Sequence, residues 1–125
     1  MFTHVMLGSN DLAKSKTFYD AVMGALGYAP AFDAGPRFFY SGSAGTLGVT
    51  VPINGQPAQF ANGGTVGLLA KDRAAVDAFH AAGISNGGAC EGRPGSRPEA
   101  PGNAYGAYLR DPDGNKICAF CELPR

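Results

Sequence analysis

Apolar and polar positions along the chain follow two alternating patterns, and each pattern occurs twice. Residues 4–7 form a short apolar run, after which the apolar positions recur at the three- and four-residue spacing of an amphipathic helix. This helix is predicted to begin near Asn10 or Asp11, because either side chain can cap a helix N-terminus, and to end at Gly27. Its apolar face carries Leu12, Tyr19, Val22 and Leu26.

The second occurrence of the pattern is shorter. An apolar run at 65–68 leads through a polar turn into a helix that is predicted to begin near Asp72 and to end at Gly83. Its apolar face presents Val76, Phe79 and His80. We expect His80 to pack beside the sheet or to meet solvent at its edge.

Six further segments carry the branched and aromatic residues typical of strands, three after each helix. They are 28–32, 37–41 and 46–51 in the first half, and 84–91, 105–110 and 116–123 in the second. Each half therefore has the order βαβββ, which predicts an α+β fold of two tandem βαβββ modules. The modules cover about 1–52 and about 64–125, and the linker at 53–63 is rich in turn-forming residues.

The two halves also align without a gap when the sequence is shifted by the spacing between Asp11 and Asp72. This shift of 61 residues places His4 against Thr65, Asp11 against Asp72, and Phe18 against Phe79. Chance matching among common residue types is the alternative, but the shared order of elements favours a duplication. One βαβββ unit leaves a sheet face exposed, so two units side by side would form a curved, mostly antiparallel sheet cup with a ligand in its concavity.

The run at 111–115, Asp-Pro-Asp-Gly-Asn, predicts a tight hairpin between the last two strands. The proline presets φ for the second turn position, and the glycine can adopt the left-handed conformation that closes the turn. If the first and last of these residues pair, Leu109 lies opposite Ile117 and Tyr108 lies opposite Cys118. Tyr108 and Cys118 then share one face of the sheet.

Composition and charge exclude several classes of function. The 125 residues suffice for a single domain, 1–125, and ten basic residues balance ten acidic ones, so we expect no nucleic-acid partner and no membrane surface. No apolar run approaches the ~20 residues of a membrane span, and no signal-peptide pattern opens the chain, so a cytoplasmic location is expected. Cys90, Cys118 and Cys121 lack zinc-finger spacing, which favours free thiols in a reducing compartment.

Together these features resemble the vicinal oxygen chelate superfamily. The resemblance rests on the repeat, the opening strand with His4, the helix opening at 11–19 and the turn at 111–115, and it covers essentially the whole chain. The superfamily includes glyoxalase I, extradiol dioxygenases, fosfomycin-resistance thiol transferases and bleomycin-resistance proteins. It therefore implies the glyoxalase/bleomycin resistance/dioxygenase fold, but no single activity, because enzymes and pure binding proteins share these motifs.

In the metalloenzymes of this family, side chains from the first and last strands of each module hold a divalent ion in the cup. His4 matches the first of these positions, but its counterpart Thr65 carries a hydroxyl, and the strand at 47–51 offers neither carboxylate nor imidazole. Cys118 stands where the family places a glutamate. Since a catalytic metal site usually has three protein ligands, no metal and no cofactor are predicted. A divalent metal held through His4 is the alternative.

His4 and Cys118 are the two candidate catalytic residues, and each also has a structural interpretation. Cys118 would either pack as a small apolar side chain and line the ligand, which we prefer, or act as a nucleophile. A nucleophile would need His4 or a cation nearby to lower its pKa from ~8.5, and the family geometry brings the two positions to one cup. For His4, a ring bonded to a backbone carbonyl explains the residue as well as a pocket role does.

Aromatic and hydroxyl side chains on the strands are the remaining candidates for ligand contact. Rings with hydroxyl tips suit a small organic ligand, although core packing must account for at least half of them. Strand alternation turns Phe38 and Tyr40 to one face and Phe39 to the other. The predicted ligand-binding residues are His4, Phe39, Tyr40, Thr50, Thr65, Tyr105, Tyr108 and Cys118.

The segment 92–102 is rich in proline and glycine and is predicted to be a loop. A loop of this length often covers or contacts something, so a lid in which Arg93 or Arg97 recognises an anionic group is one interpretation. A solvated surface loop is the other.

Three functions are compatible with these residues. The first is a metal-independent protein that binds a small organic molecule in the cup, akin to the bleomycin-resistance branch. The second is a divalent-metal-dependent lyase or dioxygenase of the glyoxalase type that uses His4, and the third is thiol-dependent chemistry at Cys118; the sequence leaves open whether the protein is an enzyme. We expect a homodimer, because the family often forms dimers, sometimes with cups shared between chains, and because a small β-rich domain has edge strands.

Overall fold

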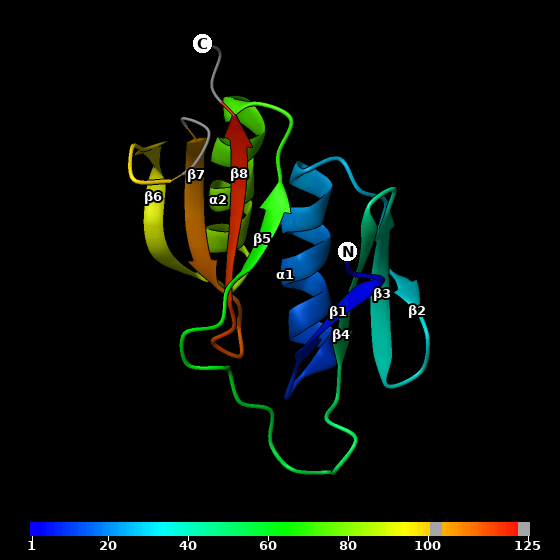
Figure 1. The fold of residues 1–125 in the computed structure, drawn as a ribbon. Coiled ribbons are helices and arrows are strands. Elements are labelled where there is room, and N and C mark those ends of the chain that lie inside the picture. The colour runs from blue at the N-terminus through cyan, green and yellow to red at the C-terminus, as the bar shows by residue number, and fades with distance from the viewer. Residues whose placement is uncertain (101–103, 123–125) are drawn as a thin grey trace.

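The computed structural model describes residues 1–100 and 104–122, which form two βαβββ modules (Figure 1). The first module contains β1 (His4–Gly8), α1 (Leu12–Ala25), β2 (Phe32–Asp33), β3 (Arg37–Gly42) and β4 (Gly45–Thr50). The second contains β5 (Val66–Leu69), α2 (Arg73–Ser85), β6 (Ala89–Arg97), β7 (Ala104–Arg110) and β8 (Lys116–Glu122). The predicted order of elements and the α+β class are therefore confirmed.

Each module forms its own four-stranded mixed sheet. The strand orders are β1-β4-β3-β2 in the first sheet and β5-β8-β7-β6 in the second. In both sheets the first strand pairs in parallel with the last, and the other neighbours are antiparallel. The sequence predicted that the two sheets lie side by side as one curved surface; among the described residues they are separate sheets with no strand pairing between them. The modules contact each other through α1 and α2 and through the hairpin at 111–115.

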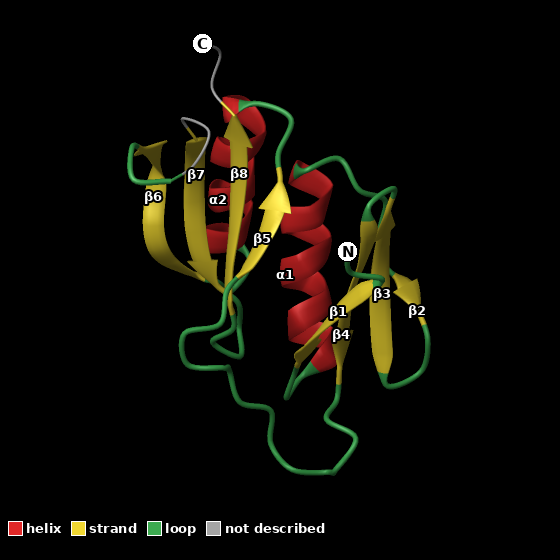
Figure 2. Ribbon diagram, in the orientation of Figure 1, coloured by secondary structure: helices red, strands yellow, loops and turns green. Residues whose placement is uncertain are grey.

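The two helices organise a single core. Helix α1 packs against α2, and each helix also packs on its own sheet, as Figure 2 shows with the helices in red and the strands in yellow. One buried cluster holds Tyr19 and Val22 of α1 together with Phe79 of α2. We call the sheet face that its module's helix does not cover the open face. No helix in the described part of the chain is both long and apolar enough to cross a bilayer.

Both helices begin with the same capping arrangement, which gives the repeat a physical meaning. The Asp11 carboxylate accepts a hydrogen bond from the Lys14 backbone N–H at 3.1 Å, and the Asp72 carboxylate accepts one from the Ala75 N–H at 2.8 Å. Each interaction satisfies one of the amide groups that a helix leaves without a partner in its first turn. The predicted starts of both helices are confirmed.

The predicted end of the second helix is wrong. Helix α2 continues past Gly83 to Ser85, and the left-handed residue that follows it is Gly87, with φ of 93°. Gly83 is instead a close-contact position, because a Cβ there would collide with the Leu109 side chain of β7. The predicted strand at 84–91 consequently begins only at Ala89.

The predicted loop at 92–102 is also wrong over its first half. Strand β6 extends to Arg97 and pairs with β7, with irregular register between Cys90 and Gly92 and again between Gly92 and Gly95. Proline and glycine are tolerated here because β6 is an edge strand and its register shifts relieve the strict ladder. Pro98 to Ala100 then form a turn, and positions 101 and 102 of the predicted loop lie outside the described residues.

The first predicted strand of the first module, 28–32, is largely absent. Only Phe32 and Asp33 form β2, because the preceding residues complete the end of α1. The Tyr28 backbone N–H donates to the Met23 carbonyl at 2.9 Å, so it is not available to a strand.

The hairpin at 111–115 has the predicted register. Tyr108 pairs with Cys118, and the Asp111 N–H donates to the Asn115 carbonyl at 2.9 Å. Gly114 adopts φ of 87°, the left-handed conformation that the turn requires.

The same hairpin fastens the second module to the first. The buried Asp111 carboxylate accepts a hydrogen bond from the Tyr19 hydroxyl of α1 at 2.6 Å, and Asn115 Nδ2 donates to the Gly8 carbonyl at 3.0 Å. Asp113 accepts from the Ser15 hydroxyl at 3.0 Å. The turn therefore positions the two open faces relative to each other.

Candidate functional site

The open face of the first sheet carries several of the predicted ligand-binding residues. His4 of β1 is the register partner of Thr46 in β4, and alternation along β4 places Thr50 on the same face. Phe39 of β3 joins them through its pairing with Gly48. The intervening residues Phe38, Tyr40, Leu47 and Val49 are buried in the core, as the predicted alternation requires.

A hollow of about 370 Å³ lies on this face. On this face Gly48 lets the Met6 thioether and the Phe39 ring lie close over β4, because a Cβ at position 48 would collide with both. At the edge of the hollow, Arg37 Nε donates to Thr50 Oγ1 at 3.4 Å. The hollow is lined by His4, Met6, Arg37, Phe39, Thr50, Val51 and Ile53.

The open face of the second sheet is built around Tyr108 of β7. Its ring meets the Phe120 ring of β8 edge to face, with 5.6 Å between centroids. Two cations lie over the same ring, the Lys116 ammonium at 5.0 Å and the Arg97 guanidinium at 5.8 Å from its centroid. A second hollow, of about 380 Å³, is lined by Leu69, Ala100, Ala104, Tyr108, Phe120, Cys121 and Glu122.

Cys118 lies on this open face beside Tyr108, but it is nearly covered, with 5% of its surface exposed. Burial raises the pKa of the Cys118 thiol to about 11, although the Lys116 ammonium acts in the opposite direction. At neutral pH the thiol is therefore protonated. A protonated thiol is a poor nucleophile and a suitable apolar lining for a ligand.

Two predicted ligand-binding tyrosines lie on the helix-facing sides of their sheets. Tyr40 is 3% exposed, and its hydroxyl donates to Asp20 at 2.7 Å. The Tyr105 hydroxyl donates to Asp77 of α2 at 2.6 Å. The structure does not bring either ring to an open face, and their hydroxyls are already used in packing the helices on the sheets.

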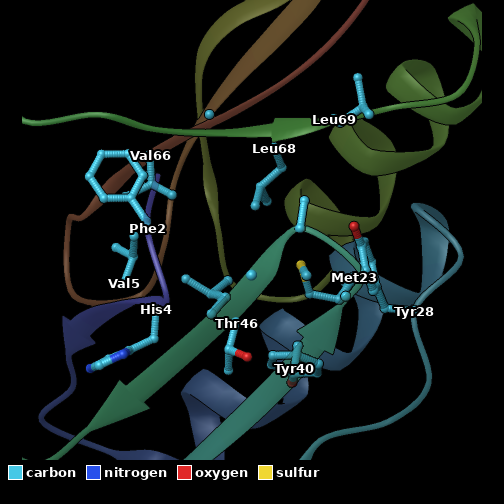
Figure 3. Close-up of a pocket in the computed structure, with 15 residues that line it drawn as sticks. Phe2, His4, Val5, Met23, Tyr28, Tyr40, Thr46, Val66, Leu68 and Leu69 are labelled. Atoms are coloured by element: carbon cyan, nitrogen blue, oxygen red, sulfur yellow. The ribbon is translucent and has the colours of Figure 1, made fainter.

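Two further hollows lie between the modules. Thr65 borders one of about 280 Å³, together with Met6 and Lys116, beside the hairpin. The other, of about 250 Å³, is lined mainly by apolar side chains; Figure 3 shows Met23, Tyr28 and Leu68 around it. Tyr40 also borders this hollow of about 250 Å³ between the modules.

The residues that the metalloenzyme resemblance singles out do not form a donor set. The described residues contain no group of three or more His, Cys, Asp or Glu side chains that could hold an ion. His4 Nδ1 is hydrogen-bonded to the Thr3 hydroxyl at 2.8 Å, rather than to the backbone carbonyl that the structural interpretation expected. These residues do not fit the usual divalent ion of the family.

His4 and Cys118, which the family geometry would place in one cup, stand on different sheets of this chain. The open face of each sheet carries one of them, and no described strand pairing joins the two sheets. The structure thus unites His4, Phe39 and Thr50 on one face, and Tyr108 and Cys118 on another.

Sequence reasoning missed three side chains that shape these faces: Arg37, Lys116 and Phe120. A signal for two of them was present, because alternation from Cys118 along β8 reaches Lys116 in one direction and Phe120 in the other. Arg37 had the same signal relative to Phe39.

Comparison with known proteins agrees with this architecture. Residues 1–119 match the family model described as Glyoxalase/Bleomycin resistance protein/Dioxygenase superfamily. The crystal structure of a glyoxalase/bleomycin resistance protein from Albidiferax ferrireducens T118 is 58% identical, with 98% of this chain and 99% of that chain covered and a TM-score of 0.94. A search of curated proteins finds no match.

More distant structures share the fold. A glyoxalase-related enzyme from Fulvimarina pelagi is 20% identical, with 98% of this chain and 88% of that chain covered and a TM-score of 0.77. Lactoylglutathione lyase from Agrobacterium tumefaciens is 23% identical, with 97% and 92% covered and a TM-score of 0.65. The family-model match over residues 1–119 and the structure that is 58% identical show that the chain belongs to the glyoxalase/bleomycin resistance protein/dioxygenase superfamily.

Proposed function

We propose that this protein binds a small, planar organic anion on its open sheet faces, and that it does so without a divalent metal. The observation that carries the proposal is the group around Tyr108, where an aromatic pair lies beside two cations. Neither Lys116 nor Arg97 forms an ion pair with a described residue. The Lys116 ammonium is therefore available to an anionic group. The Arg97 guanidinium adds positive charge there, although it already donates to the backbone carbonyls of Arg93 and Gly95. Phe120 and Leu69 offer apolar contact to a ring.

The donor chemistry supports the metal-independent part of the proposal. His4 has the Thr3 hydroxyl as its hydrogen-bond partner, and the thiol at the family's glutamate position is buried and protonated. The first open face repeats the combination of an aromatic ring with a cation, Phe39 with Arg37. Both faces thus suit recognition of the same class of molecule.

We further propose that the binding protein is a homodimer in which the open face of one copy meets that of another. Large apolar side chains stand exposed on these faces, with Phe32 at 72% and Leu69 at 77% exposure. Both are register partners of site residues, Phe32 of Phe39 and Leu69 of Phe120. A second copy would cover them and complete a cup that one chain leaves as two separate faces.

The binding proposal is tested by titrating the full chain with 8-anilinonaphthalene-1-sulfonate, a fluorescent aromatic anion, and then with a panel of planar aromatic carboxylates. We expect saturable binding that weakens as salt is added, because part of the attraction is electrostatic. Tyr108→Leu should weaken binding about fivefold, the loss that corresponds to ~1 kcal/mol of aromatic and cation–π contact. Tyr105→Leu, on the opposite face of the same strand, is the matched control and should bind normally.

Two results would contradict the proposal. Equal binding by the Tyr108→Leu and Tyr105→Leu variants would show that the open face of the second sheet is not the site. Stoichiometric tight binding of nickel, zinc, manganese or ferrous iron that is lost in His4→Ala would favour a metal-dependent lyase or dioxygenase instead.

A further inference from the structure

A second chemically distinctive pair of side chains lies outside the candidate site, on the helix-facing side of β6. Cys90 is an exposed residue of this edge strand, and its register partner Leu109 is buried beneath α2. From α2, His80 reaches the same place, and its Nε2 lies 3.2 Å from the Cys90 Sγ. Figure 1 shows α2 behind this sheet and β6 at its outer edge.

The surroundings keep His80 in the form that can accept a proton. Partial burial lowers the pKa of His80, and the Arg93 guanidinium lowers it further, while the Asp77 carboxylate acts in the opposite direction. At neutral pH the ring is therefore uncharged, and its Nε2 can accept the thiol proton when Nδ1 carries the ring hydrogen.

The other two cysteines do not share this environment. Cys118 and Cys121 are both buried, and neither forms a hydrogen bond to an imidazole among the described residues. Cys90 combines exposure with an imidazole within hydrogen-bond distance, which is the arrangement that activates thiols in proteins.

We propose that Cys90 and His80 form a thiol–imidazole pair that reacts with low-molecular-weight disulfides, so that Cys90 is a site of reversible S-thiolation. The thiol proton passes from Cys90 Sγ to His80 Nε2, and the resulting thiolate attacks one sulfur of the disulfide. A new S–S bond forms to Cys90 as the original S–S bond breaks, and the departing half leaves as a thiolate with the bonding electron pair. His80 returns the proton to that thiolate, which completes the exchange without any other oxidant.

The test measures disulfide exchange on the full native chain. With 5,5′-dithiobis(2-nitrobenzoate), one thiol per chain should react rapidly, and peptide mapping should assign it to Cys90. Its rate should exceed that of the thiols in the urea-unfolded chain, which have no fixed neighbour. A neutral probe, bis(2-hydroxyethyl) disulfide, is followed by mass spectrometry, and Cys90 should again react faster than the unfolded-chain thiols. Because this probe carries no charge, its result separates the effect of the imidazole from the attraction of Arg93 for an anionic reagent.

His80→Gln is the decisive variant, because glutamine keeps a polar side chain but cannot act as a base at neutral pH. We expect it to slow exchange at Cys90 about tenfold, a modest value for a general base that is partly exposed. His4→Gln removes the other imidazole of the chain and should leave the Cys90 rate unchanged, and Cys90→Ser should abolish the rapid phase. Circular dichroism melts of each variant verify that the fold is kept.

Two outcomes would overturn the inference. One is a Cys90 rate that is the same in His80→Gln as in the natural sequence, which would reduce the contact to packing. The other is a native Cys90 that exchanges more slowly than the unfolded chain, since an activated and exposed thiol cannot be slower than an unassisted one.

Discussion

At the residue scale, Asp20 connects helix α1 to the rest of the first module. Its carboxylate accepts hydrogen bonds from the Tyr40 hydroxyl at 2.7 Å and the Ala31 N–H at 3.1 Å, and it forms an ion pair with Lys16. Burial by itself raises the pKa of Asp20, but these three partners together outweigh it and hold the pKa below 3.8. The charged carboxylate is thus the form that the folded protein favours.

Because Tyr40 donates to Asp20, the amount by which Tyr40 stabilises the fold depends on pH. Because the folded-state pKa is depressed, Asp20 stabilises the fold above its unfolded pKa, and the contribution is lost as the pH falls through the folded value. We expect Tyr40→Phe to lower the free energy of unfolding by about 1 kcal/mol at pH 7, and the difference from the natural sequence to narrow below pH 3.8. Urea denaturation at pH 7 and pH 3 measures both values.

Tyr105→Phe is the control for this prediction, because the Tyr105 hydroxyl also donates to a carboxylate, that of Asp77, at a more exposed position. Solvent competes for the Tyr105 hydrogen bond, so Tyr105→Phe should lower the free energy of unfolding by less than Tyr40→Phe does. A larger effect at Tyr105 than at Tyr40, or a Tyr40→Phe effect that is equal at both pH values, would refute the interpretation.

At the element scale, the two helices contain glycines with opposite roles. Gly24 of α1 has no atom within 4 Å of the position where a Cβ would lie, whereas a Cβ at Gly83 of α2 would collide with Leu109. Both positions have helical backbone, so intrinsic propensity favours alanine equally at each. The packing of α2 on β7 reverses that preference at Gly83.

The paired substitutions test this difference. Gly24→Ala should raise the free energy of unfolding by about 0.5–1 kcal/mol, because it reduces the entropy of the unfolded chain and strengthens the helix. Gly83→Ala should lower it by about 1–3 kcal/mol, because the helix and β7 must separate to accept the methyl group. Thermal melts of both variants measure these opposite changes in stability. Stabilisation by Gly83→Ala would contradict the prediction and show that α2 can shift away from β7.

At the scale of the whole molecule, a shared core and the hairpin at 111–115 hold the modules together, while no described helix covers either open face. The buried cluster contains residues of both helices, and Asp111 in the last hairpin receives the hydroxyl hydrogen bond of Tyr19 from the first helix. From this shared core we expect the two modules to unfold as one cooperative unit. The two open faces belong to separate sheets, and His4 lies on one of them and Cys118 on the other.

The dimer proposal is tested at this scale. Multi-angle light scattering at micromolar concentration should give the mass of two chains, and Leu69→Glu should shift it to one chain, because a charge would be buried at the contact. Ile84→Glu places the same charge on an exposed position of α2 and should leave the dimer intact. A monomer in the natural sequence would contradict the proposal directly.

Most of the element order was predictable from the sequence because its signals are local. The aspartates that cap the two helices, the alternation that separates Phe38 from Phe39, and the turn residues at 111–115 each act within a few positions of themselves. The errors arose where a distant contact overrode the local signal. Gly83 resembles a helix end until Leu109 is present, and the prolines and glycines of β6 resemble a loop until β7 pairs with them.

The sequence by itself determined the βαβββ repeat, the register of the last hairpin and the residue types that stand at the metal-ligand positions of the family. Only the tertiary structure decided that Tyr40 and Tyr105 serve the helices, that Lys116 and Arg97 gather over Tyr108, and that His80 meets Cys90. The physical reason is the distance along the chain over which each interaction acts. Periodicity and turn chemistry are encoded along the chain, whereas the partner of a side chain is set by the packing of elements that are distant in sequence.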